Sequence, residues 1–136
     1  MTVANPGTEA TILAHWHYTR QEWKCYVRYN MRSRGRLQYI LYYLLGSGHT
    51  VIPEITITGQ KVWTGEVAVS FNDVNRYIKR ISIHDSGKIN ILAISYAILE
   101  NGNTHSAEIM VPIPKGKLKE AIRVQENLVA GISKVV

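Results

Sequence analysis

The spacing of apolar residues changes once along this 136-residue chain, and this change constrains the fold more than any other feature. From Thr50 onward, apolar and polar residues alternate in short runs, as is typical of half-buried β-strands. The runs predict strands near residues 51–58, 61–71, 77–84, 88–99 and 105–113. Residues that favour turns separate these strands, at 58–60, 72–75, 85–87 and 101–103. Because the connections are short, we expect an antiparallel meander.

Two of the predicted strands have distinct patterns. Val67, Val69 and Phe71 alternate with polar or small residues, which predicts that these three side chains share a buried face. The run from Ile89 to Leu99 is apolar on both faces, which indicates a central strand covered on both sides.

A strand and a helix are predicted before the meander. Residues 11–18 alternate so that Trp16 and Tyr18 lie on one face, while His15 and His17 lie on the other. Thr19-Arg20-Gln21-Glu22 is a capping box that begins a helix, and Ser33–Arg36 is a plausible break in it. The inward face of this helix is predicted to contain Trp23, Tyr26, Val27, Asn30 and Met31.

A second amphipathic helix is predicted from about Lys117, after two prolines that end the sheet. Its apolar stripe comprises Leu118, Ala121, Ile122, Gln125, Leu128, Val129 and Ile132. The predicted fold is therefore α+β: an N-terminal strand, a long or broken basic helix, a five- to six-stranded bent antiparallel sheet or partly open barrel, and a closing helix. Residues 1–10 are expected to be a flexible tail, and residues 11–136 one domain.

Composition excludes several classes of protein. Apolar residues make up 46% of the chain and charged residues 19%, which is unlike a disordered tail or a coiled coil. The one cysteine, Cys25, cannot form an internal disulfide and is expected to be a packed thiol. There is no apolar run of about 20 residues and no signal peptide pattern. We therefore expect a cytoplasmic protein, with peripheral contact at the inner membrane face as one option.

Most of the net charge of +6 lies in one segment. Residues 20–36 contain one acidic residue, Glu22, and six basic ones, whereas the rest of the chain contains 10 basic and 9 acidic residues. This segment is the predicted binding site for an anionic partner, either phosphate groups or an acidic protein. The alternative is an ordinary solvated helix face. The six cations are Arg20, Lys24, Arg28, Arg32, Arg34 and Arg36.

A tyrosine-rich apolar segment, residues 37–45, follows the basic helix. If helical, it spans only about 14 Å, which is half of a bilayer's hydrocarbon core. It can pack over the sheet, lie in a membrane interface, or form a contact between copies of the chain. Its three tyrosines, predicted to contact the partner, are Tyr39, Tyr42 and Tyr43.

The order of these motifs resembles the uncharacterised bacterial pleckstrin-homology-like domains of the YcxB-like family. The resemblance is carried by Tyr18-Thr19-x-x-Glu22-Trp23 at the start of a basic helix, and by Val111-Pro112-Ile113-Pro114-Lys115-Gly116-Lys117 before an amphipathic helix. It implies a seven-stranded β-barrel closed by a C-terminal helix, on the cytoplasmic side of a membrane. The resemblance implies no catalytic residue, because the family has no agreed activity.

Three smaller features remain. Lys115 and Lys117 lie at the start of the last helix, where a bound anion would relieve their repulsion from the helix dipole, although Glu120 can also offset it. His15 and His17 can reach one metal ion, but a third ligand is not evident; His84, Asp85 and His105 are candidates. These histidines are only weak candidates, and we expect no metal and no cofactor.

No motif of a known catalytic site is present: there is no nucleophile elbow, glycine-rich cofactor loop or zinc-hydrolase pattern. We therefore expect a noncatalytic binding domain that contacts an anionic partner or membrane face through residues 20–45. Alternatives are a homo-oligomeric scaffold, an enzyme without a recognisable motif, and a single-stranded nucleic-acid binder. The last would use Tyr26 and Tyr29 to stack on bases.

Overall fold

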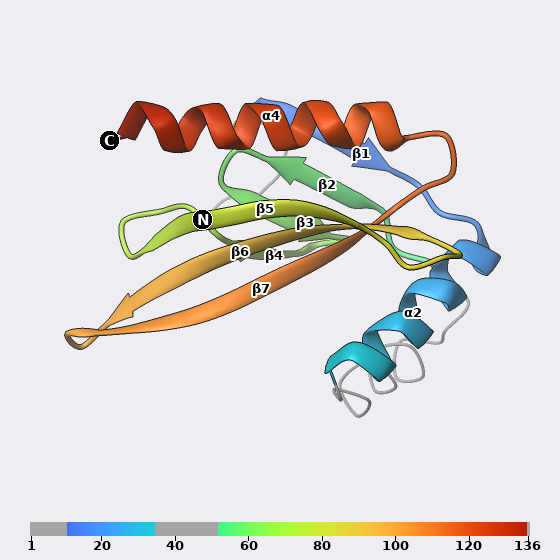
Figure 1. Ribbon diagram of the computed structural model, residues 1–136, viewed down its shortest axis with the longest axis horizontal. Helices are drawn as coiled ribbons and strands as arrows, with labels where there is room; N and C mark the ends of the chain where they lie inside the picture. Colours follow the sequence, from blue (N-terminus) through green and yellow to red (C-terminus); the bar gives the residue numbers. More distant parts are fainter. Residues whose placement is uncertain (1–10, 35–51, 136) are drawn as a thin grey trace.

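The computed structural model describes residues 11–34 and 52–135. Within these residues the chain is α+β, with two helices and two antiparallel sheets (Figure 1). The helices are α2 (Arg20–Arg34) and α4 (Leu118–Val135). The strands are β1 (Ile12–Trp16), β2 (Ile55–Thr58), β3 (Lys61–Thr64), β4 (Val67–Ser70), β5 (Arg76–Asp85), β6 (Asn90–Glu100) and β7 (Asn103–Ile113).

The strands follow one another across each sheet in chain order. The first sheet has the order β1-β2-β3-β4 and the second β5-β6-β7, with every neighbouring pair antiparallel. This confirms the predicted meander. In the first sheet, Trp16 pairs with Ile55 and His15 with Thr56, which sets the register of β1 against β2.

The hydrophobic core lies where the two sheets and α4 meet. Trp16 and Ile57 from the first sheet, and Leu92 and Ile94 from the second, are fully buried in it. Both faces of β6 are buried around Ile91–Ile94, so the prediction of a central strand covered on both sides is confirmed.

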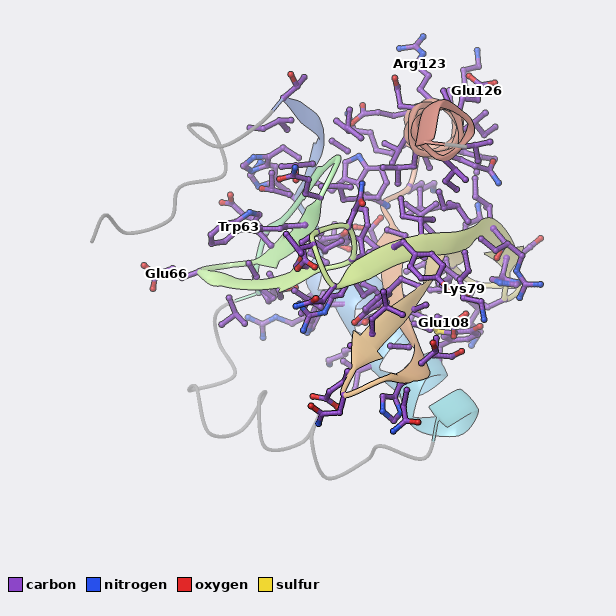
Figure 2. All side chains as sticks on the ribbon, turned by 90° about the vertical axis from the view of Figure 1, so that its left-hand side faces the viewer. Trp63, Glu66, Lys79, Glu108, Arg123 and Glu126 are labelled. Atoms are coloured by element: carbon purple, nitrogen blue, oxygen red, sulfur yellow. The ribbon has the colours of Figure 1, made fainter. Side chains whose placement is uncertain are left out.

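Helix α4 lies along one side of the sheets, while α2 extends from their other side (Figure 1). Helix α4 packs mainly against β5 and β1, and buries Ala121, Val124 and Leu128. The predicted stripe was partly wrong, because Leu118, Ile122 and Val129 at its margin are exposed. Arg123 and Glu126 point away from the sheets into solvent (Figure 2).

The predicted strand count was also wrong. The described residues contain seven strands in two sheets, where five to six strands in a bent sheet or partly open barrel were expected. These two sheets do not form a closed barrel. The predicted strand 61–71 is a hairpin, β3 and β4, that turns at Gly65. Gly65 adopts a φ of 63°, a left-handed conformation that glycine reaches without a steric penalty.

Strand β4 differs from its prediction in exposure as well. Phe71, directly after it, is fully buried, but Val67 is 59% exposed and Val69 is 43% exposed. The physical reason is position, since β4 is an edge strand of the first sheet. Glu66, at the tip of the hairpin, points into solvent (Figure 2).

Candidate functional site

The predicted capping box at the start of α2 is present. Thr19 N donates to Glu22 Oε1 over 2.8 Å, and Glu22 N donates to Thr19 Oγ1 over 3.1 Å. These bonds satisfy two of the amide groups that have no acceptor within the helix. The position at which the basic helix begins is therefore fixed by local chemistry.

Two tyrosines attach α2 to the edge of the second sheet. Tyr18 Oη donates to Pro112 O over 2.7 Å, and Tyr26 Oη donates to Met110 O over 2.8 Å. Among the described strands, β7 is at the edge of its sheet, and these two carbonyls bind tyrosine hydroxyls in place of a further strand. Burial raises the pKa of Tyr18 far above its ordinary value, with smaller contributions from Tyr26 and Glu22. Tyr18 therefore remains a neutral hydrogen-bond donor throughout the physiological pH range.

The packed side of α2 agrees with the prediction where side chains are described. Trp23 and Val27 are buried in the core, and Tyr26 is half-buried. The ring of Trp23 lies 5.6 Å from that of Tyr18 and 5.1 Å from that of Tyr26, between ring centroids. Aromatic packing thus holds one side of the helix against the sheet.

Three cations of α2 are exposed beside this packed face. Arg20, Lys24 and Arg28 are spaced four residues apart, so they form a row along consecutive turns. Within residues 11–34 and 52–135, no carboxylate forms an ion pair with any of the three. Their charge is therefore not neutralised by this part of the fold.

Lys115, predicted from the sequence as part of a different anion site, lies beside the start of α2. Lys115 N donates to Glu22 Oε2 over 2.6 Å, although the two residues are 93 positions apart. Partial burial acts to raise the pKa of Glu22, but hydrogen bonds from Lys115 and Thr19, with the Lys115 charge, lower it below its ordinary value. Lys115 itself is exposed. We call Arg20, Lys24, Arg28 and Lys115 the basic surface.

Lys117 is less available than Lys115. Its Nζ lies 3.8 Å from Glu120 Oε2, so the charge compensation considered from the sequence is present. The other oxygen of Glu120, Oε1, accepts a hydrogen bond of 2.8 Å from Trp16 Nε1. This start of α4 is therefore a structural turn joined to the core.

The structure does not describe the side chains of the other predicted contact residues. Arg32 and Arg34 belong to α2, but their side chains are not described. The remaining ones, in the segment that follows α2, are Arg36, Tyr39, Tyr42 and Tyr43.

Cys25 is a free, half-buried thiol within α2.

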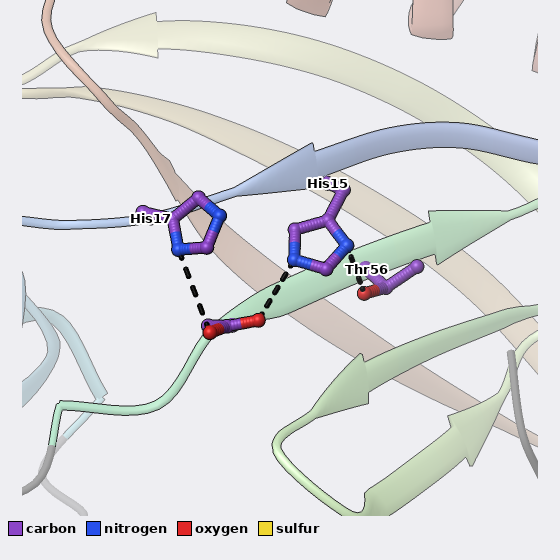
Figure 3. Close-up of polar contacts among 4 residues, drawn as sticks. His15, His17 and Thr56 are labelled. Atoms are coloured by element: carbon purple, nitrogen blue, oxygen red, sulfur yellow. Dashed lines mark hydrogen bonds and ion pairs between the residues drawn. The ribbon is translucent and has the colours of Figure 1, made fainter.

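His15 and His17 do meet a third polar group, but it is one that the sequence did not reveal. Glu54 Oε1 lies 2.8 Å from His15 Nε2, and Glu54 Oε2 lies 3.5 Å from His17 Nδ1 (Figure 3). The third ligands considered from the sequence have other partners. His105 Nε2 lies 3.7 Å from Glu100 Oε1, and His84 Nε2 lies 3.0 Å from Ser82 Oγ. Asp85, at the end of β5, accepts a bond from Gly87 N.

The signal that could have found Glu54 is the register of β1 against β2. Trp16 pairs with Ile55, so the next positions along this antiparallel pair are His17 and Glu54. A sequence alone does not give that register, because residues 17 and 54 are separated by the whole of α2 and the segment after it.

Comparisons with protein-family models, with curated proteins and with solved structures find no match for this chain. The resemblance to YcxB-like domains accordingly stays a prediction. Among the described residues, neither helix is both long enough and apolar enough to cross a bilayer.

Proposed function

We propose that this chain is a noncatalytic binding domain whose basic surface contacts an anionic membrane leaflet. The observation that carries the proposal is the row of Arg20, Lys24 and Arg28. These side chains are exposed, lie on one rigidly attached helix, and form no ion pair within the described residues.

The energetics favour a surface rather than a single small anion. Each cation near an anionic leaflet contributes about 1 kcal/mol, and guanidinium groups bind phosphate oxygens in a bidentate manner. The four cations of the basic surface, offset by the neighbouring carboxylate of Glu22, would then contribute roughly 3 kcal/mol to the free energy of binding. That is about a hundredfold in affinity, and it is sensitive to salt because the charges are exposed.

The attachment of α2 to the rest of the fold also supports binding to a membrane surface. Trp23 and Val27 face the core and two tyrosine hydroxyls bind β7, so little ordering of the helix would be needed on binding. The predicted contribution of the tyrosine-rich segment 37–45 remains part of the proposal. So does a peripheral position at the inner membrane face.

The experiment is sedimentation with vesicles of phosphatidylcholine alone, or of phosphatidylcholine with about 30–40% phosphatidylserine, which gives a strongly anionic leaflet. The test variant is Arg20→Gln, Lys24→Gln and Arg28→Gln together. The matched control replaces three exposed cations elsewhere, Arg80, Lys88 and Arg123, by glutamine.

The two triple variants have the same net charge, so only the position of the charges differs. We expect the wild type and the control to bind anionic vesicles, and the α2 variant to bind far less. Equal loss in both variants would show a general charge effect and would contradict the proposal. Binding of single-stranded RNA in preference to vesicles would replace the membrane by nucleic acid as the partner.

The pleckstrin-homology-like character of the fold is a proposal as well. It is supported by the order of elements, namely sheets of four and three antiparallel strands followed by the closing helix α4.

A further inference from the structure

We propose that His15, His17 and Glu54 form a binding site for a divalent transition-metal ion, with Zn²⁺ as the representative ion. His15 lies in β1, His17 directly follows β1, and Glu54 directly precedes β2 (Figure 3). All three residues are exposed. This site is separate from the basic surface and does not depend on the function proposed above.

The geometry is close to that of a metal site. One ligand atom from each residue lies within 4.8 Å of the other two. Around a tetrahedral zinc ion these atoms lie about 3.3 Å apart, because each is about 2.0–2.2 Å from the metal. Small side-chain rotations suffice to reach that arrangement, and all three side chains are exposed enough to make them.

The backbone holds the three residues in place. His15 and His17 are two residues apart on an extended chain, so their side chains leave the same face. Glu54 O accepts a hydrogen bond of 2.9 Å from Gly65 N, which fixes Glu54 against the β3–β4 hairpin. Ligands supported by paired strands in this way need little reorganisation to bind an ion.

A fourth residue, Thr56, can orient one of the ligands. Its Oγ1 lies 3.4 Å from His15 Nδ1, and it is buried beside the histidine. When His15 binds a metal through Nε2, its proton resides on Nδ1, facing this hydroxyl. Metal-binding histidines commonly donate their second N–H to such a partner, which fixes the ring orientation.

The type of donor selects the class of ion. Two imidazole nitrogens and one carboxylate suit Zn²⁺, Ni²⁺ or Cu²⁺, whereas Mg²⁺ and Ca²⁺ prefer oxygen donors throughout. Three protein ligands also leave a fourth position, which water or an anionic ligand can take.

The test is calorimetric titration of the full, untagged chain with ZnCl₂, repeated in competition with a chromogenic chelator. We expect one ion per chain. The variants His15→Ala, His17→Ala and Glu54→Gln should each weaken binding about tenfold or more, and Thr56→Val should weaken it about tenfold. Far-UV circular dichroism verifies that each variant is folded.

The matched control is His105→Ala, which removes an exposed histidine that also lies beside a carboxylate, Glu100. It should bind Zn²⁺ as the wild type does, and excess Mg²⁺ should not displace the ion. The proposal is overturned if the wild type binds no Zn²⁺, or if the control loses binding to the same extent. It is equally overturned if Glu54→Gln retains full affinity, because the histidines alone would then account for binding.

Discussion

Glu22 and Lys115 are joined by a hydrogen bond of 2.6 Å from the Lys115 amide to the Glu22 carboxylate. The same carboxylate accepts the Thr19 amide, so one side chain both begins α2 and ties it to the loop before α4. The structural consequence is that two cationic groups far apart in the sequence become neighbours. Glu22 is thus the residue that assembles the basic surface.

The first prediction concerns the capping box. Replacing Thr19 by Ala removes the hydroxyl that accepts the Glu22 amide, which should lower the free energy of unfolding by about 1 kcal/mol. Urea denaturation followed by circular dichroism measures this. Thr11→Ala, at an exposed threonine just before β1, is the control and should change stability little.

The second prediction is a dependence on pH. Hydrogen bonds from Lys115 and Thr19 outweigh burial and lower the pKa of Glu22 in the folded protein. The unfolded chain therefore takes up the proton first as pH falls, and that uptake favours unfolding. The stability from this carboxylate is complete above the ordinary glutamate pKa of about 4.3, and it is lost as pH falls through the lower folded value.

Glu22→Gln should accordingly destabilise the protein most at neutral pH, with the difference from wild type shrinking from about pH 5 downward. Unfolding midpoints in urea between pH 7 and pH 3 measure it. Glu126→Gln makes the same charge change at an exposed position on α4. A difference for Glu22→Gln that stays constant across this pH range would refute the assignment.

The third prediction concerns the attachment of α2 to β7. Tyr26→Phe removes the hydroxyl that binds Met110 O, and should reduce stability by about 1 kcal/mol. It should also speed amide hydrogen exchange in α2 more than in β6. Tyr77→Phe, at an exposed tyrosine on β5, is the matched control and should leave α2 exchange unchanged.

The fourth prediction tests the junction of β1 with α4. Trp16 is fully buried, and its Nε1 donates to Glu120. Glu120→Ala would leave this buried N–H without its acceptor, at a cost of about 1–3 kcal/mol. Thermal unfolding compares it with Glu126→Ala on the same helix. Equal shifts in the two variants would mean that the hydrogen bond contributes nothing specific.

Local signals predicted much of the fold. The capping box, the covered strand β6 and the buried side of α2 at Trp23, Tyr26 and Val27 each follow from residues close in sequence, and these are confirmed. The β3–β4 hairpin was missed because only two residues, Gly65 and Glu66, separate its strands. With so short a turn, residues 61–71 read as one continuous strand. The exposure of Val67 and Val69 follows from β4 being at an edge, and position in a sheet is a tertiary property.

The candidate sites divide in the same way. Exposure of Arg20, Lys24 and Arg28 follows from the helical period once the packed face is known. The contacts of Glu22 with Lys115, and of His15 with Glu54, join residues 93 and 39 positions apart. Such contacts depend on how the elements are arranged in space, which local patterns do not specify.

The most direct test of the central claim is the affinity for anionic vesicles measured at low and at physiological salt. We compare the wild type with the Arg20→Gln, Lys24→Gln, Arg28→Gln variant and with the control variant at Arg80, Lys88 and Arg123. The account predicts that only the α2 variant loses both the affinity, by about a hundredfold, and most of its salt dependence. Vesicle binding that is the same for all three proteins, or absent from the wild type, would contradict it.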